Sequence, residues 1–249
     1  MVPSVPGLEG HTRTPALSFL LEHSSGRRLV FDLGIRRDYQ NYAPKIAEYI
    51  PTMGYKIEVE KNVAEILGDH GVAAEDVDGV IWSHWHWDHI GDPSTFPSST
   101  DLIAGPGFKE AMLPGYPANP DSPIPESDYA GRTLREITFN PGRGRIGRFP
   151  AADYFGDGSF YLLDSPGHAM SPPRRMNVSG LTVVQLQSGR GRKTTDSLFD
   201  PTFGYDIPLA METIRKLQEV DCDEDKFVII AHDSAVRDGV PHFPAALNE

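Results

Sequence analysis

The fold can be inferred from the stretch Ser83-His84-Trp85-His86-Trp87-Asp88-His89-Ile90-Gly91-Asp92, which places three histidines and two carboxylates close together. It follows the apolar run at 77–82, which is typical of a short buried strand. His84 and His86 are two residues apart, so on an extended strand end both side chains point the same way. Asp88 and His89 follow the turn and can reach the same hollow from its other side. Imidazole and carboxylate donors suit zinc, or a related ion such as iron or manganese, so this spacing predicts a metal site.

The composition is that of an ordinary globular protein. Of the 249 residues, 39% are hydrophobic and 23% are charged, which is enough apolar material for one substantial core. We therefore expect a single domain over residues 1–249, with an extended arm at 1–15 and a proline-rich surface loop at 114–130. The net charge of -12 argues against nucleic acid or an anionic membrane as the main partner. A small-molecule substrate is the expected partner, and the oligomeric state is left open.

The cysteine count and the N-terminus bear on location. Cys222 is the only cysteine, so no internal disulfide can form and a thiolate-rich structural zinc site is excluded. The first residues lack the basic and apolar regions of a signal peptide. No run approaches the ~18 apolar residues of a membrane span. These features predict a cytoplasmic protein that does not enter a membrane.

Apolar runs separated by turn residues indicate an α/β fold. We expect a hairpin at 16–33 that closes on Asp32 and Gly34, and a mixture of helix and loop at 38–50. The other expected elements are helices at 59–70, 108–113 and 206–220, strands at 77–82, 159–164, 180–187 and 226–231, a strand and turn at 101–107, and edge strands at 135–139 and 147–154.

Two further histidines follow strand-like runs. His168 comes after the strand at 159–164 and the turn Ser165-Pro166-Gly167, and His232 comes directly after the strand at 226–231. With the motif at 84–89 they give three strand ends, which a sandwich can bring to one rim. Ligands distant in the sequence must meet in this way, so His168 and His232 are predicted to join the metal site.

With these residues the sequence resembles the metallo-β-lactamase superfamily, in its branch of fungal lactonase-like hydrolases and N-acyl homoserine lactonase-type enzymes. The resemblance covers residues 16–170 and 193–238, and it implies an αββα sandwich that starts late and has either a deletion or a shifted gene model at about 170–192. It implies one or two zinc ions, with the ligands His84, His86 and His168 for the first and Asp88, His89 and His232 for the second. Asp88 is also the candidate catalytic residue.

The resemblance also implies the reaction. Metal-bound hydroxide would attack the carbonyl of a lactone or lactam ring, as in hydrolases of secondary metabolism. A thioesterase of the same fold, acting on a carrier-bound or glutathione-bound acyl group, is the alternative.

One feature of the family is absent. Its members carry, after the histidine that corresponds to His168, a strand that ends in an aspartate bridging two ions. Here the strand at 180–187 is followed by Ser188-Gly189-Arg190, and the next acids are Asp196 and Asp200. We therefore expect a weakly held second ion, and a catalytically impaired remnant is a further functional hypothesis.

Three other aspartates lie near the predicted ligands in the sequence or in the expected fold. Asp92 or Asp233 either orients a ligand imidazole or is a plain turn carboxylate. The resemblance places Asp32 on the floor of the sheet near the metals, and an ordinary strand-end turn explains it equally well.

Overall fold

A computed structural model describes residues 14–140, 142, 144–171, 176–177, 180–185, 206–222, 229, 231–232 and 234–247. The strands are β1 (Phe19–Glu22), β2 (Arg28–Phe31), β3 (Gly79–Ile81), β4 (Asp101–Ala104), β5 (Leu134–Glu136), β6 (Arg145–Ile146), β7 (Phe149–Asp153), β8 (Phe160–Ser165), β9 (Met170–Ser171), β10 (Met176–Asn177) and β11 (Gly180–Gln185). The α-helices are α1 (Pro44–Tyr49), α2 (Val63–Asp69), α3 (Trp87–Ile90), α4 (Phe108–Met112), α5 (Ile207–Asp221) and α6 (Ser234–Gly239). Short 3₁₀ helices are η1 (Tyr39–Asn41), η2 (Ile50–Met53), η3 (Ala74–Asp76), η4 (Pro93–Thr95) and η5 (Glu126–Asp128). Within these ranges, none of the helices has the length and apolar character needed to cross a membrane.

The strands form two main sheets. The first has the order β1-β2-β3-β4-β5, in which β1 is antiparallel to β2 and the later pairs are parallel. The second has the order β11-β8-β7-β6 and is antiparallel throughout. Because β2, β3 and β4 are parallel, their carboxyl ends lie at the same edge of the sheet. This edge carries the histidine motif that follows β3.

The first sheet is buried on both faces, as its strand sequences predict. Val30, Val80 and Leu102 belong to a core that also contains Ile46 of α1 and Phe108 of α4. Their neighbours along the strands belong to a separate core between the two sheets; its buried members are Leu29, Phe31, Ile81, Ile103, Phe160, Leu162 and Leu181. Successive side chains of a strand point to opposite faces, so the alternation follows directly from the sequence.

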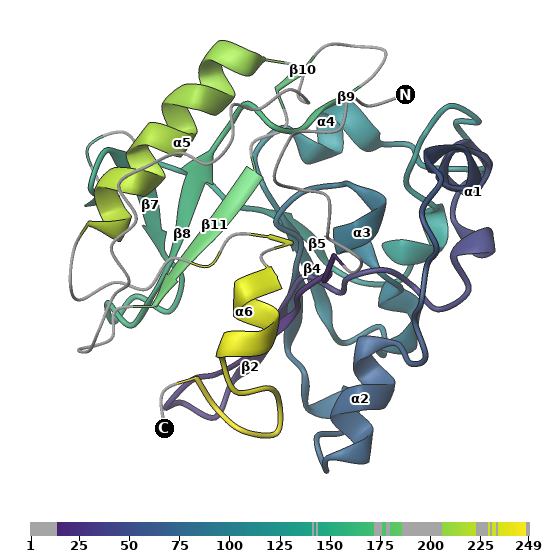
Figure 1. Cartoon of the computed structure of the whole chain (residues 1–249), viewed down its shortest axis with the longest axis horizontal. Coiled ribbons are helices and arrows are strands. Elements are labelled where there is room, and N and C mark those ends of the chain that lie inside the picture. Colours follow the sequence, from purple (N-terminus) through teal and green to yellow (C-terminus); the bar gives the residue numbers. More distant parts are fainter. Residues whose placement is uncertain are drawn as a thin grey trace.

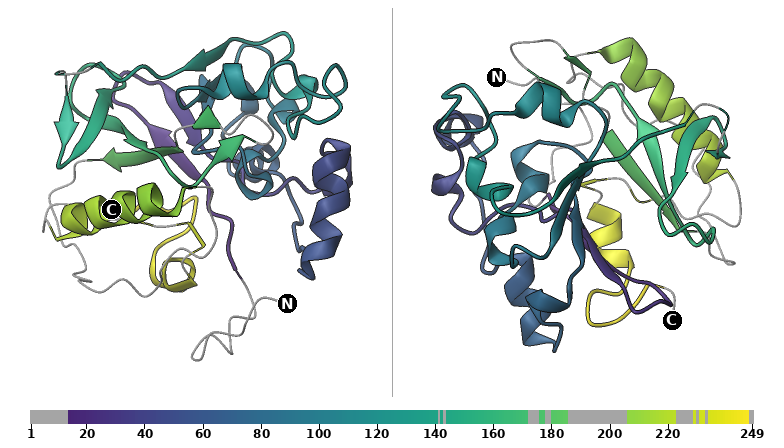
Figure 2. Two further views of the ribbon diagram at one scale, coloured as in Figure 1. Left: turned by 90° about the horizontal axis from the view of Figure 1, so that it is seen from above. Right: turned by 180° about the vertical axis from the view of Figure 1, so that it is seen from behind.

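Helices cover the outer face of each sheet. α5 packs on the second sheet, where Val220 and Leu217 contact Phe149 and Leu163. Figure 1 shows the resulting layers in order, from α5 through β7, β8 and β11, then β2, β4 and β5, to α1. The view from behind in Figure 2 shows the same order reversed. The expected αββα sandwich is thus confirmed.

Individual elements agree with the sequence in most places. The hairpin, the helix at 206–220 and the short helix at 108–113 are confirmed. The helix expected at 59–70 begins only at Val63, because the Asn62 N–H donates to the Glu65 carboxylate (2.8 Å) in the manner of a capping box. The strand expected at 147–154 is confirmed as β7, but its expected edge position is wrong, since β7 lies between β6 and β8. Most of the strand expected at 226–231 lies outside the described residues.

Candidate metal centre

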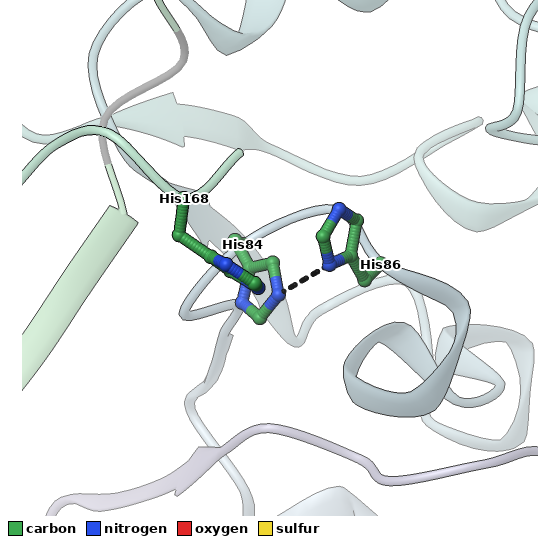
Figure 3. Close-up of side chains that lie close together, drawn as sticks. All are labelled: His84, His86 and His168. Carbon is green, nitrogen blue, oxygen red and sulfur yellow. Dashed lines mark hydrogen bonds between the residues drawn. The ribbon is translucent and has the colours of Figure 1, made fainter. Parts of the chain in front are cut away.

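The six predicted ligands lie together in two groups. His84, His86 and His168 form the first group, and Asp88, His89 and His232 form the second. In each group the possible ligand atoms all lie within 4.8 Å of one another. Figure 3 shows the first group, with His84 and His86 from the loop after β3 and His168 from the turn after β8. Three segments far apart in the sequence therefore converge, as the strand-end argument predicts.

Two glycines allow the segments to approach so closely. Gly91, directly after α3, has φ +50°, and a Cβ there would lie 2.3 Å from Cβ of Leu33. Gly167, directly before His168, has φ +113°, and a Cβ there would lie 2.5 Å from the Ala210 amide nitrogen of α5. Both backbone conformations favour glycine. The glycines of the motif and of the Pro-Gly-His turn thus serve packing around the site.

The second group has its proton positions fixed by hydrogen bonds. Nδ1 of His89 lies 2.8 Å from the Asp32 carboxylate, and Nδ1 of His232 lies 2.8 Å from the Pro15 carbonyl oxygen. Both partners are acceptors only, so each ring carries a proton on Nδ1. The Nε2 atoms of both rings face Oδ2 of Asp88, at 3.8 Å for His89 and 3.1 Å for His232.

Ser83 connects Asp32 to the first group by hydrogen bonds. Its hydroxyl donates to Oδ2 of Asp32 (2.7 Å) and therefore accepts from Nδ1 of His84 (2.9 Å). His84 is left with an unprotonated Nε2, which lies 2.9 Å from Nδ1 of His86. Asp32 also accepts from the Ser83 amide at 2.6 Å. One buried carboxylate thus orients a ring in each group.

Burial and mutual proximity set the charge state of the first group. Burial lowers the pKa of His84 well below its ordinary value, and the neighbouring histidines lower it further. Burial likewise lowers the pKa of His86 to about 3 and lowers the pKa of His168. The three rings are therefore neutral at pH 7, which is the form that binds a metal ion.

Asp88 in the second group is ionised. Burial alone would raise its pKa, but the hydrogen bond from His232 and the nearby imidazoles lower it to about 2. The bond to Asp88 in turn raises the pKa of His232.

The donors present fit a divalent cation. Three neutral imidazoles converge in the first group, where Nδ1–H of His86 donates to the unprotonated Nε2 of His84. In the second group two Nε2 atoms face a carboxylate while their Nδ1 protons are held elsewhere, which is the usual preparation of histidine for metal binding. Nitrogen donors with one carboxylate are the set expected for zinc or a similar ion.

Sequence reasoning missed Ser83 and left Asp32 undecided. The contact between these two residues follows from the sheet topology, because β2 and β3 are parallel neighbours with Phe31 opposite Ile81. Residues just past their ends, Asp32 and Ser83, therefore meet. Of the other two aspartates, Asp92 pairs with Arg36 (3.1 Å) and accepts from the Ser94 amide, so it is a turn carboxylate. Asp233 lies outside the described residues.

The expectation that a bridging aspartate would follow the carboxyl end of the strand at 180–187 does not agree with the direction of this strand. β11 runs antiparallel to β8, with Gly180 opposite Ser165 and Gln185 opposite Phe160. Its amino end contacts the site, where the Leu181 amide donates to the Ser83 carbonyl (2.7 Å). The carboxyl end of β11 points away from the site and is not where a bridging aspartate would lie. Asp196 and Asp200 lie outside the described residues.

Comparisons with known proteins agree with this geometry. The model of the metallo-beta-lactamase superfamily matches residues 11–169. Cytochrome P450 monooxygenase mpaDE of Penicillium brevicompactum is 36% identical over 99% of this chain, but the chain spans only 33% of that protein. Gamma-lactamase FDB1 of Fusarium pseudograminearum is 36% identical over 99% of this chain and 72% of its own length.

The fold has a counterpart among solved structures. A crystal structure of a Bacillus thuringiensis AiiA variant with N-decanoyl-L-homoserine bound at the active site has a TM-score of 0.67 and 21% identity, covering 93% of this chain and 86% of that one. The alignments to mpaDE and FDB1 run over 282 and 300 residues, more than the 249 of this chain. Both relatives therefore contain residues that have no counterpart here.

Proposed function

This chain belongs to the metallo-beta-lactamase superfamily, and we propose that it is a metal-dependent hydrolase that opens a lactone or lactam ring. The observation that supports this best is the pair of facing ligand groups with His89 and His232 both aimed at Asp88. The relative named as a gamma-lactamase supports a cyclic amide, and a cyclic ester requires the same attack on a ring carbonyl.

The residues of the chain have separate parts in this proposal. His84, His86 and His168 would hold one cation, and Asp88, His89 and His232 would hold a second. Such a cation, zinc by preference, would lower the pKa of a bound water molecule and polarise the carbonyl of the substrate. Asp32 orients the His89 ring and Ser83 orients the His84 ring. Asp88, ionised at neutral pH, is the acceptor through which a proton would pass.

The test combines metal content with a screen of substrates. We expect zinc to bind the purified protein, and γ-butyrolactone, 2-pyrrolidinone or a simple thioester to reveal which bond is cleaved in a pH-indicator assay. His84→Ala and His86→Ala should each lower ring opening by at least about 1000-fold, since ligands act as a unit. His23→Ala, in the β1–β2 turn, is the control and should retain full activity. Equal activity in all four proteins, or full activity after removal of metal, would refute the proposal.

An impaired enzyme is the second candidate, favoured by the residues that the relatives have and this chain lacks. It predicts fewer than two equivalents of zinc per chain together with little or no ring opening. Two tightly held equivalents and turnover would exclude it.

A further inference from the structure

The helix α3 carries two of the candidate ligands and is too short to hold itself together. It has only four residues, and Asp88 and His89 among them belong to the second ligand group. The last four carbonyl groups of an α-helix have no partner inside the helix, and in α3 these are all of its carbonyl groups. Its own backbone bonds end at the His86 carbonyl, which accepts from the amides of His89 and Ile90 (3.0 and 3.2 Å). The carbonyl groups of α3 therefore need donors from outside the helix.

The first sheet supplies two of these donors, at the C-terminal end of α3. The Leu33 amide, just past β2, donates to the His89 carbonyl (2.8 Å). The indole N–H of Trp82, just past β3, donates to the Ile90 carbonyl (3.0 Å). The end of the helix that carries His89 is thus fixed to the edge of the sheet.

The carbonyl group of Trp87, at the N-terminal end of α3, has a side-chain donor. In a longer helix it would accept from the Gly91 amide, but that amide donates to the Gly34 carbonyl (3.0 Å). The Tyr42 hydroxyl takes its place and donates to the Trp87 carbonyl at 2.6 Å. This carbonyl belongs to the peptide group that joins Trp87 to Asp88. Its orientation therefore sets the direction in which the Asp88 side chain leaves the backbone.

Tyr42 is itself held firmly. It is 3% exposed, the Arg36 amide donates to its hydroxyl oxygen (3.0 Å), and the Arg36 guanidinium carbon lies 5.4 Å from the centre of its ring. Burial raises the pKa of Tyr42 above its ordinary value, so the hydroxyl keeps the proton that it donates. The side chain does not line the groove that opens beside His86 and Asp88, so it does not contact a substrate there.

We propose that Tyr42 is a positioning residue of the second ligand group, and that its hydroxyl holds Asp88 in place through the peptide group between Trp87 and Asp88. Without this donor the peptide group can rotate, and Oδ2 of Asp88 then leaves its place 3.1 Å from Nε2 of His232. The inference rests on the proposed function for the role of Asp88 as a metal ligand. The first ligand group lies outside α3, so it should not depend on Tyr42.

The test isolates each ligand group before the hydroxyl is removed. His168→Ala leaves only the second group intact, and His232→Ala leaves only the first. Tyr42→Phe is then added to each, because phenylalanine fills the same space and lacks only the hydroxyl. Competition with a chromophoric chelator should show about 10-fold weaker zinc binding in the His168→Ala background, the lower end of the range for residues that support a ligand. In the His232→Ala background zinc affinity should stay within about threefold.

Tyr129→Phe is the matched control for the loss of a tyrosine hydroxyl. The Tyr129 hydroxyl accepts from the Gly115 amide (2.8 Å), and its ring packs against the same core as Tyr42. This variant should leave zinc affinity within about threefold in both backgrounds.

Hydrogen exchange of the metal-free protein provides a measurement that needs no ion. Mass spectrometry of a peptide spanning 83–92 reports on the amides of α3. Its exchange should be at least about fivefold faster in Tyr42→Phe, because the helix opens more often when one of its carbonyl groups loses its donor. Tyr129→Phe should leave this exchange unchanged.

The possible outcomes separate the inference from the proposed function. Equal loss of zinc affinity in the two backgrounds, or no loss in the His168→Ala background, would overturn the inference, and ring opening by the parent protein would leave the proposed function standing. Absence of zinc binding by the parent would refute the proposed function. If the parent or His168→Ala binds no zinc, hydrogen exchange decides: faster exchange only in Tyr42→Phe supports the positioning role, and unchanged exchange overturns it.

Discussion

Asp32→Asn tests whether one buried carboxylate organises the metal centre. Asp32 is 3% exposed, and three donors point at its two oxygens: the Ser83 amide, the Ser83 hydroxyl and Nδ1 of His89. Asparagine has the same shape and tolerates the left-handed backbone that Asp32 adopts, with φ +58°, so the backbone should not change. It offers only one acceptor oxygen, however. Whichever way its amide is turned, the NH₂ group faces a buried donor.

The size of the effect follows from these contacts. Leaving a buried donor unpaired costs about 1–3 kcal/mol, so the free energy of unfolding should fall by that amount. The His89 ring also loses the partner that holds its proton on Nδ1. A proton that moves to Nε2 occupies the atom facing Asp88, and loss of such an outer partner weakens metal affinity about 10–100-fold.

The assay is zinc competition with a chromophoric chelator, together with urea unfolding. Asp92→Asn is the matched control, because Asp92 is also buried and also accepts from an amide and a hydroxyl, those of Ser94, but pairs with Arg36 and not with a histidine. It should lower stability by about 1–3 kcal/mol and leave zinc affinity within about threefold of the parent. Equal loss of affinity in the two variants, or no loss in Asp32→Asn, would refute the orienting role.

Two further predictions concern a close backbone contact beside the site and a buried carboxyl. Gly91→Ala should lower the free energy of unfolding by more than about 3 kcal/mol, because the added Cβ would lie 2.3 Å from Leu33. Gly68→Ala, in open space on α2, is the control and should raise the free energy of unfolding by about 0.5–1 kcal/mol. Similar changes for the two variants in urea unfolding would contradict this prediction. For Asp128, burial raises the pKa to about 8, so the carboxyl is protonated in the folded chain and ionised in the unfolded chain between about pH 4 and 8, and native stability falls as pH rises through that window. Asp128→Asn removes this dependence, and its stability relative to the parent should increase by about 1 kcal/mol per pH unit between pH 5 and 7. A difference that is constant with pH would show that Asp128 is already ionised in the folded protein.

The sequence predicted those parts of the site that follow from local pattern. The spacing of residues 84–89 identifies candidate ligands because strand periodicity alone aligns His84 with His86. His168 and His232 were predicted since each follows an apolar run, and strand ends of a sandwich share a rim. To predict the contact between Ser83 and Asp32, one must also know that β2 and β3 are parallel and how they are registered. Strand pairing is a long-range property, so neither residue carries a local signal that distinguishes it from an ordinary turn.

The direction of β11 was another long-range property, and it changes the argument about the second ion. From Gly180 to Gln185 the strand carries the chain about 17 Å away from the site, at ~3.4 Å per residue. The lack of an acid at the end of β11 is thus no evidence against a second ion. What still argues for a weak second site is that the relatives have residues that this chain lacks.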